Sequence, residues 1–169
     1  MTQMFDAGAF SPSAACLSDA AELEAALGHV DHMAVALMGA SPDCIKLLDL
    51  DGNLLFMSAN GQCAMQIDDF DALRGAKWSD LWPEPMQGLV SRSLATPLRG
   101  GMSRFVGQCP TARGEMRVWD VMVTPVLDRA VAADKSPVRL LSTSRDVTAQ
   151  YGAGLPERGI PMAGFRSDA

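Results

Sequence analysis

The chain has 169 residues, of which 48% are hydrophobic and 20% charged, a balance that fits one globular domain and argues against a disordered, fibrous or two-domain protein. Its 14 Lys and Arg residues against 20 Asp and Glu residues give a net charge of -6, which disfavours non-specific attraction to nucleic acid or to an anionic membrane surface. No signal-peptide pattern opens the chain, and no stretch reaches the roughly 18 consecutive apolar residues of a spanning helix. We therefore expect a cytoplasmic protein that contacts neither nucleic acid nor membrane.

The N-terminal part divides into an arm and a helix. Residues 1–17 show no sustained hydrophobic period, so we expect a mobile arm. Residues 18–39 carry an N-capping signal at Asp19 and a stop at Gly39, which predicts an amphipathic helix. Its apolar stripe could pack on the chain's own sheet or on the same helix of a second subunit, and we interpret it as a dimerisation element. The stripe consists of Leu23, Leu27, Val30, Ala34 and Leu37.

Residues 40–149 carry the pattern of one α+β domain. Two apolar runs at 43–50 and 53–58 flank Asp51-Gly52, the dipeptide of tight hairpin turns, and predict two strands. Short helices or turns follow, then a longer helix at 84–98 with Gly100-Gly101 at its exit. Three further strands are predicted at 102–109, 115–128 and 136–148, which completes a five-stranded antiparallel sheet with short helices on one face. Residues 150–169 contain several Gly and Pro residues and predict a flexible tail.

Sequence motifs give no indication of catalysis or of a metal centre. The cysteines are scattered without a CxxC pair or a neighbouring histidine, which argues against a zinc site or a disulfide framework. Nucleophile-elbow, HExxH, P-loop and dinucleotide-binding motifs are all missing from the sequence. Cys109 would be a reactive thiol only if it were exposed beside a basic side chain, and a buried, inert cysteine is the commoner state. We therefore do not expect an enzyme.

Three motifs in order resemble the PAS domain family. The run SPDCIKLLDLDGNLLFMSAN looks like the first two PAS strands and the start of the next helix, WDVMVTPV like the penultimate strand, and SRDVT like the terminal Asp-Ile-Thr signature. The resemblance covers about Pro42 to Thr148. It implies a sensory or regulatory module of bacterial two-component-like signalling, which holds a small ligand between the sheet and its short helices. The same resemblance implies a homodimer that acts on an effector protein such as a kinase or regulator.

Strand alternation separates two faces of the segment WDVMVTPV. Trp119 and Val123 lie on one face and Val118 and Met122 on the other. Similarity to flavin-binding PAS members implies that the Trp119 face lines the pocket, and we add Val118 and Met122 to the predicted dimerisation surface. A competing interpretation is that Trp and Met side chains fill the space, which would leave a ligand-free protein-interaction module. The predicted ligand-binding residues are Trp78, Trp82, Phe105, Gly107, Cys109, Trp119, Val121, Val123, Ser142 and Ser144.

The resemblance also bears on cofactors, and it favours neither flavin nor haem. Light-sensing LOV members carry an Asn-Cys pair in the region that here reads GAKWSDLWPEP, which has no cysteine. Trp119, Cys109 and Ser144 stand where the flavin-polarising Asn, Asn and Gln are expected. Haem-binding members present a histidine beside the sheet, whereas the two histidines of this chain, His29 and His32, precede the domain. The identity of the ligand therefore stays open.

Overall fold

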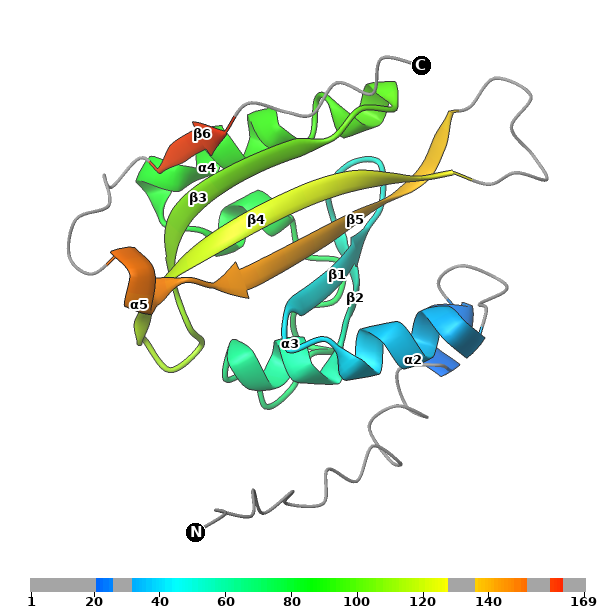
Figure 1. Ribbon diagram of the computed structural model, residues 1–169, viewed down its shortest axis with the longest axis horizontal. Helices are drawn as coiled ribbons and strands as arrows, with labels where there is room; N and C mark the ends of the chain where they lie inside the picture. Colours follow the sequence, from blue (N-terminus) through cyan, green and yellow to red (C-terminus); the bar gives the residue numbers. More distant parts are fainter. Residues whose placement is uncertain (1–20, 26–31, 128–135, 152–158, 163–169) are drawn as a thin grey trace, which may run out of the picture.

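The computed structural model describes residues 21–25, 32–127, 136–151 and 159–162, and the predicted arm at 1–17 lies outside them. In this part of the chain six strands form one antiparallel sheet in the order β2-β1-β5-β4-β3-β6 (Figure 1). The α+β class is confirmed, and the sheet has one strand more than predicted. The strands are β1 (Cys44–Leu48), β2 (Leu54–Met57), β3 (Ser103–Pro110), β4 (Met116–Leu127), β5 (Pro137–Asp146) and β6 (Ile160–Met162).

Short helices occupy most of the chain between β2 and β3, and others flank the sheet. Met86 and Val90 of α4 are buried in the same core as Phe105 of β3 and Trp119 of β4, so this helix covers one face of the sheet. We call it the helix-covered face. The helices are α2 (His32–Ala40), α3 (Ala59–Ala64), η1 (Trp78–Leu81), α4 (Glu84–Ser93), η2 (Pro97–Arg99) and α5 (Thr148–Tyr151), and residues 21–25 are also helical.

The β1–β2 hairpin forms where it was predicted but has a longer turn. The Gly52 amide donates to the Asp49 carbonyl oxygen at 3.1 Å, so the turn spans Asp49 to Gly52, and Gly52 takes the positive φ of 83° that glycine adopts without strain. The strand register then shifts beside Leu47 and Leu48. This bulge sets Leu48 opposite Leu54 and leaves Leu55 as the extra residue. The two strands are consequently shorter than the predicted segments.

The predicted helix at 84–98 is divided in two. The α4 helix ends at Ser93, and η2 begins at Pro97. Proline has no backbone N–H with which to continue the α-helical hydrogen bonds, and it fits the first turn of a new helix. Gly100 closes η2 in the left-handed conformation with φ of 83°. The glycine stop was therefore predicted correctly, but the break between Ser93 and Pro97 was not predicted.

The segment 150–169, for which a flexible tail was predicted, contains regular structure in its described residues. Thr148–Tyr151 form α5, and Ile160–Met162 form β6, which pairs antiparallel with β3 through Val106, Phe105 and Arg104. The three residues of β6 are too few to show a strand alternation, and its pairing depends on backbone hydrogen bonds to the edge of β3. Residues 152–158 and 163–169 lie outside the described part of the chain.

The N-terminal helical segments pack on the opposite face of the sheet. Leu23 and Val35 are buried against Leu47 of β1 and Phe56 of β2. The Asn60 side-chain amide donates to the carbonyl oxygens of Gly39 and Ser41, which ties the end of α2 to the start of α3. Leu23 therefore serves the chain's own core, the alternative that the sequence left open.

The remaining residues of the predicted dimerisation surface have different positions. Ala34 and Leu37 of α2 are exposed, and Leu27 and Val30 lie outside the described residues. On the sheet, Met122 is half-buried. Val118 is a correction: it is only 3% exposed, because Val106 and Val147 cover it within the same chain, so it offers no surface to a second subunit.

Candidate functional site

A cavity of about 220 Å³ lies between the sheet and its short helices. Most of its lining is apolar, and the few polar groups belong to Lys46, Thr111 and Ser144. Cavities of about 150 Å³ are large enough to accept a benzene ring, so this space is of a size for a small organic molecule. Its lining residues are Lys46, Leu54, Met57, Met65, Ile67, Leu73, Trp78, Leu81, Trp82, Cys109, Pro110, Thr111, Ala112, Trp119 and Ser144.

An aromatic cluster forms one wall of this cavity. The Trp78 and Trp82 rings meet edge to face with centroids 6.0 Å apart, and Trp82 meets Phe105 in the same way at 5.5 Å. Such edge-to-face pairs add stability beyond the area that they bury. Trp119 is held from the sheet side, where its indole N–H donates to the Cys109 carbonyl oxygen at 3.1 Å. The wall is therefore fixed in position by its own packing.

Half of the predicted ligand-binding residues line the cavity. These are Trp78, Trp82, Cys109, Trp119 and Ser144. The other five are buried on the same face of the sheet, and the structure does not bring them to the lining of this cavity. They are Phe105, Gly107, Val121, Val123 and Ser142.

Packing in front of Gly107 explains why only half of the predicted residues line the cavity. A Cβ atom built on Gly107 would overlap the Met86 methyl group and would lie 3.2 Å from Cζ3 of Trp82. Side chains of α4 and of the aromatic cluster thus fill the region beside the small residue. The sequence alternative, that Trp and Met side chains fill the interior, holds for the space directly in front of Gly107, and the cavity begins beside it, at Cys109 and Trp119, and extends to Lys46 of β1.

Lys46 is the most unusual residue of the lining. It is 4% exposed, and its Nζ donates to Ser144 Oγ at 3.0 Å. Ser144 is its one side-chain partner in the described part of the chain, where no Asp or Glu side chain lines the cavity. Burial of a cation without a counter-ion costs several kcal/mol, so such a residue is rarely retained for stability alone.

A buried hydroxyl lies next to Lys46 in the sheet. Ser142 of β5 pairs in register with Lys46 of β1. Its hydroxyl is fully buried and has no hydrogen-bond partner within the described residues. The β1–β5 pair therefore brings a lysine and two serine hydroxyls together on the helix-covered face.

The buried thiol of Cys109 does not support a nucleophilic role. Burial raises its pKa to about 11, which outweighs the opposite effect of the nearby Lys46 charge. A thiol with this pKa is almost entirely protonated at neutral pH, and the thiolate is the reactive form. Cys109 therefore acts as part of the apolar wall.

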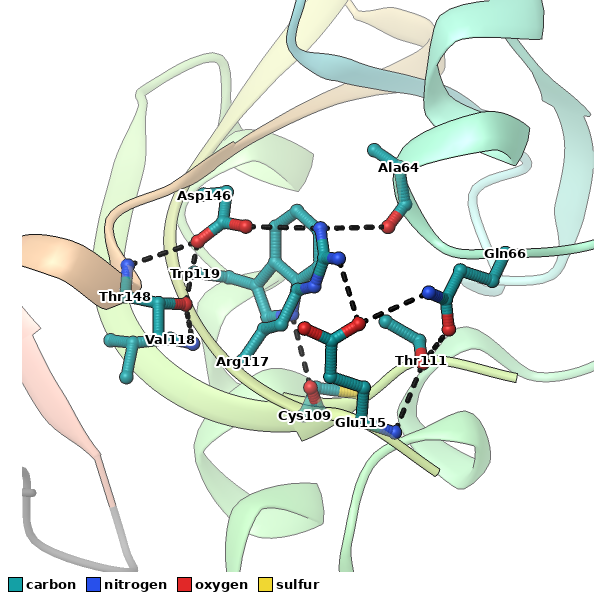
Figure 2. A network of polar contacts seen from close by, with 10 residues as sticks. All are labelled: Ala64, Gln66, Cys109, Thr111, Glu115, Arg117, Val118, Trp119, Asp146 and Thr148. Carbon is teal, nitrogen blue, oxygen red and sulfur yellow. Dashed lines mark hydrogen bonds and ion pairs between the residues drawn. The ribbon is translucent and has the colours of Figure 1, made fainter. Parts of the chain in front are cut away.

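Beside the cavity, polar side chains join the chain after α3 to the β3–β4 hairpin (Figure 2). The Thr111 hydroxyl donates to Gln66 Oε1 at 2.6 Å, and the Gln66 amide donates to Glu115 Oε2 at 3.0 Å. The backbone of Ala112 also donates to the Met65 carbonyl oxygen at 2.9 Å. The hairpin and the chain after α3 are therefore joined beside the cavity.

Arg117 extends this network to the end of β5. Its guanidinium pairs with Glu115 at 2.9 Å and with Asp146 at 3.1 Å, as Figure 2 shows. Asp146 in turn accepts from the Thr148 amide and hydroxyl, and the Thr148 hydroxyl accepts from the Val118 amide. Burial works against ionisation of Asp146, but the hydrogen bonds from Thr148 and the Arg117 charge outweigh it and lower its pKa. The network thus runs from Thr111 in the cavity lining to Thr148 at the start of α5.

Metal binding finds no support in the described residues. They contain no group of three His, Cys, Asp or Glu side chains that could hold an ion. His32 is exposed at the start of α2, and His29 lies outside the described part of the chain. None of the described helices has the length and apolar composition needed to cross a bilayer.

The sequence prediction missed Lys46 and three lining residues from loops, Met65, Ile67 and Thr111. Lys46 lies within the strand predicted at 43–50, and strand alternation places it on the same face as Cys44 and Leu48, which are buried in the core with Trp119. Met65, Ile67 and Thr111 come from loops whose positions depend on tertiary contacts. No periodic pattern could have identified these three residues.

The sequence matches the PAS fold family over residues 38–152. The chain belongs to this family. Solved structures agree, among them the PAS domain of an HTR-like protein from Haloarcula marismortui, with 18% identity, a TM-score of 0.54, and coverage of 75% of this chain and 99% of that one. A PAS domain from Colwellia psychrerythraea has 14% identity and a TM-score of 0.59, and the match covers 69% of this chain and 96% of that one.

A third neighbour is the LOV protein of Rhodobacter sphaeroides, with 17% identity, a TM-score of 0.54, and coverage of 70% of this chain and 67% of that one. No curated protein matches the chain. At these identities the structural neighbours establish the fold, and the specific ligand must be argued from the PAS domain's own residues. Membership of the family places the chain among the sensory modules of signalling proteins.

Proposed function

We propose that this PAS domain is a sensor that binds a small molecule in the cavity beside Lys46 and reports its presence through dimerisation or to an effector such as a kinase or regulator. The observation that supports it is the cavity of about 220 Å³, whose apolar walls surround a buried lysine that has no counter-ion among the described residues. Concave sites with apolar walls and a few convergent polar groups are typical of ligand pockets.

The polar network offers a physical route from the cavity to the rest of the domain. A ligand that moves Met65 or Thr111 also moves the hydrogen bonds that reach Asp146 through Arg117. A ligand with unequal affinity for two arrangements of this network shifts their populations. The route ends at α5, so the end of β5 and the α5 helix would change their positions together.

The outward surface of α2 supports an output through contact with another chain. Met33 is 70% exposed and Leu37 is 67% exposed, although both are large and apolar. Homodimerisation through this helix remains our proposal. These exposed residues also favour the second candidate function, a protein-interaction module that needs no ligand.

A thermal-shift screen tests the ligand-binding function on the complete chain. We would screen a library of small metabolites against the wild type and against Ile67→Trp, which adds an indole at a half-buried lining position. The control is Leu127→Trp, at an exposed position outside the cavity. The proposal predicts compounds that stabilise the wild type and the control but not Ile67→Trp. A screen in which no compound distinguishes Ile67→Trp from the control would contradict it.

Analytical ultracentrifugation tests the output. We expect a wild-type dimer and weaker association in Leu37→Glu, which leaves the buried Leu23 and Val35 in place. Leu127→Glu serves as the control, since Leu127 is exposed at the end of β4. A dimer unchanged by Leu37→Glu would remove α2 from the output.

A further inference from the structure

We infer that the cavity selects small organic acids, with one carboxylate held by Lys46 and Ser144 and an apolar body held by the aromatic wall; this inference rests on the proposed ligand-binding function. Lys46 lies on β1, a strand whose five residues are all buried, and Lys46 itself is only 4% exposed. It lines the cavity and carries a positive charge into an apolar space. The missing counter-ion is therefore expected to arrive with the ligand.

The free donors fit a single carboxylate. A lysine ammonium has three N–H donors, and Ser144 Oγ accepts one of them. The Ser144 oxygen is thus an acceptor in this contact, and its own O–H remains available as a donor. Two ammonium hydrogens and one hydroxyl match the acceptor positions of two carboxylate oxygens. Charge-assisted bonds of this kind are the strong ones.

The donor set is too small for a phosphate group. Arginine is absent from the described lining, and Lys46 is its single cation. A phosphate dianion carries three strongly accepting oxygens and more charge than one lysine neutralises. A monocarboxylate balances the one charge of Lys46.

The rest of the lining determines the body of the ligand. Trp78 and Trp119 present aromatic surfaces, and Met57 and Met65 provide flexible, polarisable side chains that adapt to irregular shapes. The volume of about 220 Å³ suits one substituted ring or a short branched chain. An arylacetic acid therefore represents the inferred class.

A matched pair of probes tests the inference on the full chain. Phenylacetate and phenylacetamide have nearly the same shape and differ in charge. Ligand-observed NMR titrations are expected to show that the wild type binds phenylacetate at least tenfold more tightly than phenylacetamide. Lys46→Met keeps the length of the side chain without its charge and should bind the two probes equally. Lys77→Met, at an exposed lysine outside the cavity, should keep the wild-type preference.

The outcomes separate this inference from the proposed function. Equal binding of the two probes to the wild type, lost in Ile67→Trp, would overturn acid selection and leave the cavity as a ligand site. A tenfold preference retained in Lys46→Met would overturn the role of Lys46. Binding of neither probe to the wild type would also overturn the inference, while the metabolite screen decides the proposed function independently. The wild-type comparison stays decisive even if Lys46→Met fails to fold.

Discussion

The same substitution at two glycines should change stability in opposite directions. Gly88 lies on the exposed side of α4, where a Cβ atom would contact only the flexible end of Arg92, with Nη1 at 3.3 Å. Alanine is favoured over glycine in a helix interior by about 0.5–1 kcal/mol. Gly88→Ala should therefore raise the free energy of unfolding by that amount, which corresponds to about 1–4 °C in melting temperature.

Gly107→Ala should destabilise the domain instead. The new methyl group would overlap the buried Met86 side chain and press on Trp82, 3.2 Å away. Overpacking of this kind costs about 1–3 kcal/mol, and loss of glycine's freedom in the unfolded chain recovers about 0.4–1 kcal/mol. A net loss of about 0.5–2 kcal/mol follows, measurable by urea unfolding.

A double-mutant cycle identifies the cause of that loss. Met86→Ala alone should cost about 2–5 kcal/mol because it opens a cavity in the core. In that background Gly107→Ala has room for its methyl group, so its own cost should disappear, with a coupling energy of about 1 kcal/mol or more. A Gly107→Ala effect that matches Gly88→Ala, or that persists unchanged without the Met86 side chain, would refute the packing of α4 on this strand.

Three further predictions concern charges and thiols. Without ligand, Lys46→Met should be about 1 kcal/mol more stable than the wild type in urea unfolding, since desolvation of an unpaired cation costs more than its single hydrogen bond returns; a less stable variant would contradict this. The lowered pKa of Asp146 means that its contribution to stability is present above its ordinary value of 3.8 and is lost as pH falls through the folded value. The melting temperature of Asp146→Asn should therefore lie below that of the wild type at pH 7 and approach it near pH 3, whereas a constant difference would exclude the ion pair with Arg117. Iodoacetamide at pH 8 should modify exposed Cys63 well before Cys109, whose pKa is raised to about 11, as peptide mass spectrometry would show; equal rates would mean that the thiol of Cys109 is accessible.

Local patterns predicted most of the sheet because each central strand carries its own signal. Alternation along β4 assigned Trp119, Val121 and Val123 to one face, and these residues are all buried in the core on that face. The short strand β6 carried no such signal. Its three residues are too few for an alternation, and its pairing with β3 depends on backbone groups that nearly every sequence possesses.

The cavity was harder to predict, because its volume depends on how long side chains meet. Whether Gly107 faces empty space or the Met86 methyl group is decided by the approach of α4, which no strand pattern contains. The outer face of the sheet is a second example. Strand alternation directs Val118 outward, but Val147 packs over it and buries it. Lys46 could have been placed by alternation, but its missing counter-ion is a property of the assembled lining.

Methyl NMR of methionine tests the central claim most directly, since the chain supplies its own reporters. Met57 and Met65 line the cavity, whereas Met33 and Met116 are exposed elsewhere. Titration of the full chain, labelled at the methionine methyl groups, with phenylacetate should shift the signals of Met57 and Met65 and leave those of Met33 and Met116 in place. Shifts confined to Met33 and Met116, or no shift at Met57 and Met65 at saturating probe, would contradict an organic-acid site beside Lys46.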